Sequence, residues 1–254
     1  MSADKDWLER TELLVGTAQI AALKKANILI VGLGGVGSFA GEFIARAGVG
    51  RMTIVDGDVV DLTNINRQLP ATHKTVGQSK AKLMSDRLLD INPEIQLTVL
   101  REFLQPERMD LVVSEGNFDF VVDCIDSVTP KLNLIEACLR HNVKLISSMG
   151  AGGKIDASRV VVTDISKTTT DPFAHHIRKQ LKRRGIKPKG FAAVFSDEPV
   201  NPLSLRLTDG TNFKKSFYGT ISYIPALFGL HAAAHVIQEL IKEKTENIEI
   251  ETIE

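Results

Sequence analysis

Residues 28–37 read Ile-Leu-Ile-Val-Gly-Leu-Gly-Gly-Val-Gly, an apolar run that breaks into closely spaced glycines before a helical pattern over 37–47. This order predicts a strand, a glycine-rich turn and a helix that together bind phosphate. Gly32 allows the tight turn, Gly34 lets the backbone approach a phosphate, and Gly37 lets the helix pack closely on the strand. The helix N-terminus offers unpaired N–H groups to an anion. We therefore expect a nucleotide site, although this motif alone does not identify the nucleotide.

Strand and helix patterns alternate on both sides of this loop. The expected strands are 27–31, 51–56, 95–100, 118–124 and 144–148, and helical patterns begin at Gly37, Gly77, Glu107 and Pro130. This alternation predicts an α/β fold with a doubly wound, mostly parallel sheet. The functional site is expected at the carboxyl ends of its strands.

The chain is expected to form a single domain over residues 1–254, with a nucleotide-binding core at 1–165 and a C-terminal α+β elaboration at 166–254. The patterns after residue 150 are a strand at 159–164, a basic helix at 171–184, short extended pieces to about 217 and a long apolar helix that ends near Lys244. Residues 219–238 contain no Asp, Glu, Lys or Arg, but they include Pro225, His231 and His235. Since a lipid-facing helix tolerates such residues poorly, we expect a packed helix and no membrane insertion.

Composition excludes several functional classes. The 31 basic and 31 acidic residues balance, so the overall charge does not attract nucleic acid. The two cysteines, Cys124 and Cys138, form no CxxC pair and therefore provide neither a disulfide framework nor a structural zinc site. Both lie in elements that should be core, where thiols are inert. His231 and His235 alone make half a zinc site. A reducing cytoplasm is the expected location.

Polar residues follow the second strand. Asp56 ends it, where a carboxylate accepts hydrogen bonds from ribose hydroxyls, as it also does in NAD enzymes. The long polar loop that follows carries Asp58, Asn64 and Arg67 and suits a triphosphate better than a nicotinamide. Lys80 lies in the first turn of the next expected helix, against the helix-dipole preference, where it can reach an anion.

Asp126 and Ser127 follow the strand at 118–124, at the same edge of the sheet as the glycine loop. Asp126 is placed to bind a metal ion or the nucleotide. These residues also suit the N-cap of the helix that begins near Val128. Both interpretations stay open for this pair alone.

Together these segments resemble the adenylating domain of the ubiquitin-activating-enzyme superfamily over roughly residues 8 to 165. The matching motifs are Gly32-Leu-Gly-Gly-Val-Gly37, Asp56-Gly-Asp58, Asn64-Ile-Asn-Arg67-Gln68, Gly77-Gln-Ser-Lys80 and Asp123-Cys-Ile-Asp126. The resemblance implies a Rossmann-like adenylating fold that uses ATP and Mg²⁺. A substrate carboxylate would attack the α-phosphate and release pyrophosphate.

The resemblance also implies roles for individual residues. Phosphate contacts fall to Gly35, Asn64, Arg67 and Lys80, the ribose contact to Asp56, and the Mg²⁺ contact to Asp126, with Ser127 beside it. The superfamily acts as homodimers, and Arg10 resembles the arginine that is inserted into the partner's site. Fixed cations suit the charge that develops on the α-phosphate, so Arg10, Arg67, Lys80 and Asp126 are the expected catalytic residues.

The cysteine pattern favours one branch of this superfamily. Members that activate carrier proteins usually carry CxxC pairs and a catalytic cysteine, and this chain has neither. It is instead similar to the branch that dehydrates threonylcarbamoyladenosine in tRNA. The features that carry this similarity are Arg10-Thr-Glu-Leu-Leu14, Ile125-Asp-Ser127, Gly150-Ala-Gly-Gly153, Asp164-Ile-Ser-Lys-Thr168, Asp171-Pro172 and Phe195-Ser196. In that reaction ATP activates the threonyl carboxylate, and the tethered ureido group closes the ring and expels AMP without a cysteine relay.

The segment 178–189 is basic and contains no acid, which suits RNA phosphates but equally a solvated helix face. The candidate RNA-binding residues are Arg178, Lys179, Lys182, Arg183 and Arg184. The expected partner is therefore tRNA that carries threonylcarbamoyladenosine, and association with a sulfur-trafficking protein is left open. The alternatives are an adenylyltransferase for the C-terminal glycine of a ubiquitin-like or sulfur-carrier protein, an NAD-dependent oxidoreductase, and a nucleotide-binding sensor.

Overall fold

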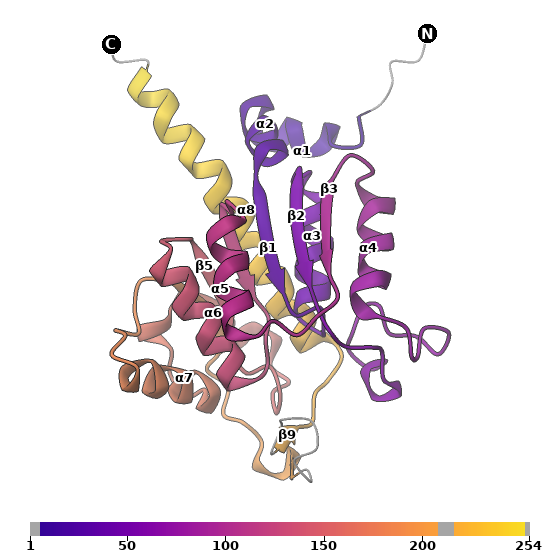
Figure 1. Ribbon diagram of the computed structural model, residues 1–254, viewed down its shortest axis with the longest axis vertical. Coiled ribbons are helices and arrows are strands. Elements are labelled where there is room, and N and C mark those ends of the chain that lie inside the picture. The colour runs from indigo at the N-terminus through magenta and orange to yellow at the C-terminus, as the bar shows by residue number, and fades with distance from the viewer. Residues whose placement is uncertain (1–5, 208–215, 252–254) are drawn as a thin grey trace.

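The computed structural model describes residues 6–207 and 216–251. In this part of the chain a seven-stranded sheet has the strand order β3-β2-β1-β4-β5-β7-β6 (Figure 1). Its strands are β1 (Asn27–Val31), β2 (Arg51–Val55), β3 (Gln96–Leu100), β4 (Phe120–Asp123), β5 (Leu145–Ser148), β6 (Val160–Asp164) and β7 (Ala192–Ser196). Only β6 runs antiparallel to its neighbour within this sheet. The prediction of a doubly wound, mostly parallel sheet is confirmed.

Helices cover both faces of the sheet, which explains why its central strands are apolar throughout. Alternate side chains of β1 enter different cores: Ile28 and Ile30 join one, and Leu29 and Val31 join the other. The first core contains α3 (Gly37–Arg46), α4 (Lys80–Ile91) and α8 (Tyr223–Glu251). The second contains α5 (Pro106–Glu115), α6 (Val128–Arg140) and α7 (Pro172–Arg183).

The long apolar helix α8 packs against α3 and the sheet. Buried residues recur one turn apart along its inner face, at Ile224, Phe228, Ala232 and Val236. Gly229 allows the two helices to approach closely, because a Cβ there would lie 2.4 Å from the Val36 carbonyl oxygen. The helix is long and apolar enough over Tyr223–Lys242 to cross a membrane, and 39% of that window is buried inside the protein. Packing explains the apolar inner face, and the helix continues to Glu251 rather than ending near Lys244.

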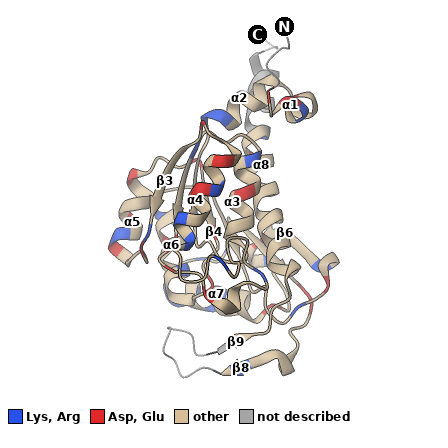
Figure 2. Cartoon of the chain, turned by 90° about the vertical axis from the view of Figure 1, so that its right-hand side faces the viewer, with Lys and Arg blue, Asp and Glu red and all other residues tan. Residues whose placement is uncertain are grey.

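The C-terminal segment contributes to the main sheet as well as to a smaller one. β7 lies beyond residue 165, yet it enters the sheet between β5 and β6, where Ala193, Val194 and Phe195 are buried. β8 (Leu205–Leu207) and β9 (Ser216–Tyr218) form a separate antiparallel pair. Figure 2 shows this pair at the end of the molecule opposite α1 (Glu9–Val15) and α2 (Thr17–Lys25). The expected α+β elaboration is therefore present, and its strand β7 is part of the core sheet.

Candidate nucleotide-binding site

The glycine loop lies between β1 and α3. Gly32 has a φ of +91°, a conformation that favours glycine, and its N–H donates to the Val55 carbonyl at 2.8 Å. A Cβ on Gly37 would lie 1.8 Å from the Gly32 carbonyl oxygen, so α3 meets the loop at a distance that only glycine allows. A Cβ on Gly35 would lie 2.9 Å from Pro225 Cβ. The loop is thus packed on its protein side.

Asp56 supports this loop directly. Its carboxylate accepts hydrogen bonds from the Leu33 N–H at 2.6 Å and from the Asp58 N–H at 2.7 Å. Burial raises the pKa of Asp56 above its ordinary value, although these two donors and the charge of Lys80 oppose the rise. Each carboxylate oxygen keeps a lone pair, so the group can also accept hydrogen bonds from ribose hydroxyls.

Lys80 begins α4 behind its N-cap residue, Ser79, three residues later than the predicted start at Gly77. Lys80 is 5% exposed, and its Nζ lies 3.0 Å from Asp58 Oδ2. The Lys80 N–H also donates to the Asp58 carbonyl at 3.1 Å. This pairing holds a buried cation beside Asp56, next to the glycine loop.

The polar loop after β2 folds around the short 3₁₀ helix Leu62–Asn64. The Asn64 side chain accepts a hydrogen bond from the Asp61 N–H at 3.1 Å and so helps to shape the loop. Arg67 Nη1 donates to the Thr63 carbonyl at 2.9 Å. Burial lowers the pKa of the Arg67 guanidinium, while the negative charges of Asp126 and Asp61 oppose the effect. The structure therefore brings Arg67 within the electrostatic range of Asp126.

Asp126 is exposed in the loop after β4, and Ser127 occupies the N-cap position of α6. The Ser127 side chain makes no capping hydrogen bond; its Oγ lies 3.5 Å from Asp126 Oδ1. The Ser127 side chain therefore does not cap α6. Among the described residues, no group of three or more His, Cys, Asp or Glu side chains could hold a metal ion. A Mg²⁺ ion at Asp126 would need further oxygen ligands, such as water molecules or phosphate oxygens.

A buried ion pair that was not predicted from the sequence lies at the start of the Asp126 loop. Lys131 and Asp123 are both 0% exposed, and Lys131 Nζ lies 2.7 Å from Asp123 Oδ2. Ser147 Oγ donates to the same oxygen at 2.6 Å, and the Ile125 N–H donates to Asp123 Oδ1 at 3.0 Å. The pair fixes the start of the segment that carries Asp126. An acid at the end of an apolar strand was the available signal, but its partner depends on how α6 packs.

A second buried pair joins the C-terminal segment to the same end of the sheet. Lys154 Nζ lies 2.6 Å from Asp171 Oδ2 and donates to the Ser196 carbonyl at 2.7 Å. Asp171 also caps α7 by accepting the Ala174 N–H at 2.7 Å. A Cβ on Gly150, just after β5, would lie 3.4 Å from Asp171 Oδ2. The start of α7 is therefore fixed at the carboxyl ends of β5 and β7.

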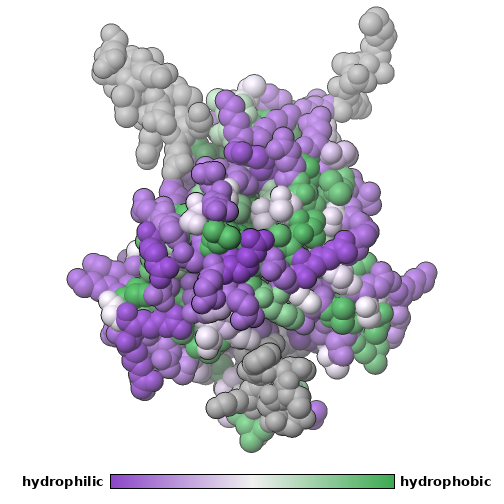
Figure 3. Space-filling model, in the orientation of Figure 1, coloured by the Kyte–Doolittle hydropathy of each residue, from purple (hydrophilic) through white to green (hydrophobic). Residues whose placement is uncertain are grey.

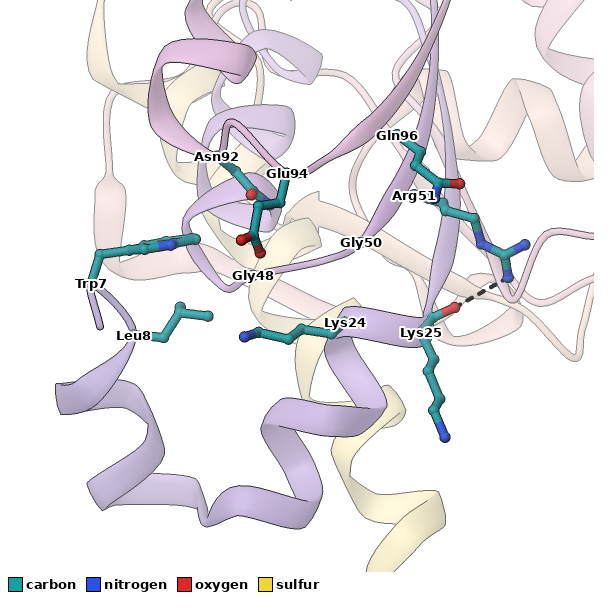
Figure 4. Close-up of a pocket in the computed structure, with 10 residues that line it drawn as sticks. All are labelled: Trp7, Leu8, Lys24, Lys25, Gly48, Gly50, Arg51, Asn92, Glu94 and Gln96. Atoms are coloured by element: carbon teal, nitrogen blue, oxygen red, sulfur yellow. Dashed lines mark hydrogen bonds between the residues drawn. The ribbon is translucent and has the colours of Figure 1, made fainter. Parts of the chain in front are cut away.

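Arg10 does not lie at this site within one chain. It is exposed on α1, which lies with α2 at the amino ends of the strands (Figure 1). A cavity of about 540 Å³ lies at that end, between Trp7 and Leu8 on one side and Glu94 on the other (Figure 4). Gly48 and Gly50, which precede β2, also line it, so this cavity is at the opposite end of the sheet from the glycine loop.

The predicted RNA-binding residues occupy different environments. Arg178 and Lys182 line a second cavity of about 350 Å³. Arg184 is paired with Glu136 at 2.9 Å. Lys179 and Arg183 are exposed on α7 outside that cavity. Their RNA-binding role stays a prediction.

The cysteines and the C-terminal histidine are surrounded by core residues. Burial raises the pKa of the Cys124 and Cys138 thiols well above the ordinary value, so neither is a thiolate near neutral pH. The ring of His235 packs edge-on against Phe120 with 5.8 Å between centroids, and burial lowers its pKa. The side chains of Cys124, Cys138 and His235 therefore serve to pack the core.

A glycine loop, an acidic strand end and two cations converge at the carboxyl ends of a doubly wound sheet, and together they define an α/β nucleotide-binding protein. Comparison with protein families agrees with this class. The ThiF family matches residues 8–253, and the chain belongs to that family.

The relatives differ in how much of the chain they share. A tRNA threonylcarbamoyladenosine dehydratase of Bacillus subtilis (strain 168) is 41% identical over 243 residues, which are 92% of this chain and 94% of the relative. The crystal structure of Escherichia coli tRNA N6-threonylcarbamoyladenosine dehydratase, TcdA, in complex with ATP has a TM-score of 0.85 and 36% identity, and the match covers 94% of this chain and 95% of that one. The Escherichia coli molybdopterin-synthase adenylyltransferase is 38% identical over 142 residues, only 56% of this chain and 55% of that protein. Similarity to the dehydratases therefore includes the C-terminal segment.

Proposed function

We propose that this protein is an ATP-dependent enzyme that dehydrates N6-threonylcarbamoyladenosine in tRNA to its cyclic form. The observation that carries the proposal is similarity to the dehydratases over more than nine-tenths of both chains, with an ATP complex among the matching structures. The threonyl carboxylate attacks the α-phosphorus of ATP and displaces pyrophosphate. The ureido nitrogen then attacks the activated acyl carbon and displaces AMP. The nucleoside loses one water, and the ATP becomes AMP and pyrophosphate.

The described residues fit ATP. The Gln68 side chain lies against the glycine loop, since a Cβ on Gly34 would be 3.5 Å from its Nε2. Its buried Oε1 has no hydrogen-bond partner within the described chain, so the amide is a polar group that a ligand can engage. Backbone N–H groups of the loop, Arg67 and Lys80 would bind phosphates, and Asp56 and Asp58 would hold the ribose side. Asn64 shapes the loop that presents Arg67.

The proposal includes Mg²⁺ and a homodimer. Asp126 would hold the ion together with phosphate oxygens, because Mg²⁺ commonly binds through one carboxylate and substrate phosphates. When bound, the ion would neutralise charge on the phosphates. Ser127 would support Asp126 from its neighbouring position. Arg10 would enter the site of a second copy, because its own site lies at the other end of the sheet.

The inert cysteines agree with this chemistry. The acyl group and the ureido nucleophile belong to one nucleoside, so the second step is intramolecular and gains from proximity. No thiolate relay is needed, and burial keeps Cys124 and Cys138 protonated. We place the enzyme in the cytoplasm, where reduced thiols and tRNA occur together.

The decisive experiment for the proposed dehydration measures the masses of the tRNA nucleosides. The protein is incubated with ATP and tRNA that contains threonylcarbamoyladenosine, the tRNA is digested, and the nucleosides are analysed by mass spectrometry. We expect the modified nucleoside to lose about 18 Da, the mass of one water, only when ATP and protein are both present. An unchanged mass with folded, ATP-binding protein would overturn the proposal.

One alternative has a specific observation in its favour. Over 142 residues the chain is also 38% identical to a molybdopterin-synthase adenylyltransferase. If the chain activated a carrier protein, ATP–pyrophosphate exchange would depend on that carrier and not on tRNA. Exchange that requires modified tRNA would reject this alternative.

A further inference from the structure

A second cavity lies at the far end of α7, away from the glycine loop. It has a volume of about 350 Å³ and is lined by Ser166, Arg178, Lys182, Lys187, Pro188 and Lys189. Four of these six residues are cations and none is an acid. Hydrophilic side chains dominate the surface at the lower left of Figure 3, the part of the molecule in which Figure 1 shows α7.

The chain reversal after α7 builds this cavity. Gly185 has a φ of +76°, and the Ile186 N–H donates to the Leu181 carbonyl at 3.0 Å, which closes the helix end. The chain therefore turns back, and Lys187 and Lys189 line the cavity together with residues of α7. Arg178 and Lys182 are four residues apart and so share one helix face. Two separate segments thus supply cations to one cavity.

Neither the helix dipole nor nearby acidic side chains explain why these four cations gather at the cavity. Cations in the last turn of a helix complement its dipole, which explains Lys182 but not Lys187 and Lys189, because these two follow the helix. Among the side chains that the structure describes, none forms an ion pair with these three lysines. The adjacent acid, Asp164, accepts hydrogen bonds from the N–H groups of Ser166 and Gly190 at 2.8 and 2.7 Å. Like charges held this close favour an anion between them.

Arg178 gives the cavity a fixed wall. The residue is partly buried, and its Nη1 donates to the hydroxyl of Thr168, which is 4% exposed. A guanidinium held in this way is preorganised for a phosphate and loses less freedom on binding than a free surface lysine. The site therefore combines one arginine held by a hydrogen bond with three lysines that form no ion pair within the described chain.

We infer that this cavity binds a backbone phosphate of the tRNA, at a distance from the adenosine that reacts. This inference rests on the proposed function. α7 begins at the carboxyl ends of β5 and β7, and its 12 residues place its far end about 18 Å from that starting point. A folded RNA stem spans such a distance, and phosphate contacts supply most of the affinity for RNA without reading its sequence.

The test compares two double variants with the same change in charge. Lys187→Gln/Lys189→Gln neutralises the cavity, and Lys25→Gln/Lys74→Gln neutralises two exposed lysines that lie outside it. Binding of an unmodified tRNA transcript is measured by filter binding across a series of salt concentrations. We expect the cavity variant to raise the Kd about tenfold and to lower the salt slope by about 1, because one phosphate contact is lost. The matched variant should change the Kd less than about twofold.

Several outcomes would overturn the cavity as the phosphate site. Equal weakening by both variants would assign binding to diffuse charge over the protein surface. Unchanged tRNA binding by the cavity variant would remove the role altogether, and so would an effect confined to inorganic phosphate or to phosphatidylglycerol vesicles. ATP binding and thermal unfolding serve as folding controls for both variants. Because the transcript carries no threonylcarbamoyladenosine, this test does not depend on the dehydration assay, and the two proposals fail separately.

Discussion

Lys131 and Asp123 form an ion pair of 2.7 Å in which both side chains are fully buried. The pair joins α6 to the end of β4, and Asp123 also accepts the Ile125 N–H. Removing one member would leave the other charge buried without its partner. The segment that carries Asp126 begins at this point, so the pair links stability to the site.

We expect Lys131→Met to lower the free energy of unfolding by about 3–5 kcal/mol. The measurement is chemical denaturation, with a lower midpoint and an unchanged slope. Arg140→Met is a suitable comparison, because the Arg140 to Asp110 pair of 2.7 Å is exposed and should contribute less than about 1 kcal/mol. Similar losses in the two variants would show that burial of the Lys131 pair does not matter.

Asp126→Asn should reduce dehydration of modified tRNA by about 100-fold or more, because the carboxylate that would hold Mg²⁺ at the reacting phosphate is lost. The residue is exposed, so the thermal midpoint should change little. Turnover is measured by mass analysis of the nucleosides. Wild-type turnover would remove Asp126 from the mechanism.

Arg10→Ala should be inactive as a pure protein and should regain activity when mixed with Asp126→Asn. In a mixed dimer, one site combines the intact Arg10 of one chain with the intact Asp126 of the other. Native mass spectrometry would establish that mixed dimers form. If they form and remain inactive, Arg10 does not act across the dimer.

The cysteines should be unreactive in the folded protein and dispensable for activity. Burial raises the pKa of both thiols, so iodoacetamide at pH 8 should label Cys124 and Cys138 only after denaturation. In the unfolded chain the two thiols lose their protons at about pH 8.5, whereas in the folded chain they keep them. The free energy of unfolding should therefore fall as the pH rises above that value. A cysteine-free variant that folds but cannot dehydrate tRNA would contradict the thiol-free mechanism.

Gly37→Ala and Gly41→Ala test the glycine loop within one helix. A Cβ on Gly37 would lie 1.8 Å from the Gly32 oxygen, whereas one on Gly41 would meet Ile30 Cδ1 at an ordinary 3.5 Å. We expect Gly37→Ala to lose about 3 kcal/mol of stability and most ATP binding. Gly41→Ala should be neutral or gain up to about 1 kcal/mol, since alanine favours helices. Calorimetry with and without ATP measures both effects.

Local patterns were sufficient to predict the central sheet and the edge that carries the site. The strand at 28–31 is a continuous apolar run, and Asp56 and Asp126 follow strands whose carboxyl ends must share one edge. The sequence could not place β7, because Ala-Ala-Val-Phe-Ser is a short run in a segment rich in turns, and its neighbours in the sheet are distant in sequence. The partner of Asp123 and the cavity near Gly185 were also beyond local patterns, since helix packing and a chain reversal create them.

The buried Lys154 contact has a mechanical consequence. It links three separate segments, because one ammonium group binds Asp171 at the start of α7 and the Ser196 carbonyl at the end of β7. The first turn of α7 therefore cannot tilt away from the sheet without breaking a buried ion pair. Helix α7 therefore keeps a fixed distance between the carboxyl ends of the strands, where it starts, and the basic cavity at its far end. The enzyme would then select a tRNA by the distance between its reacting adenosine and the backbone phosphate in the cavity, without contacts that recognise other bases.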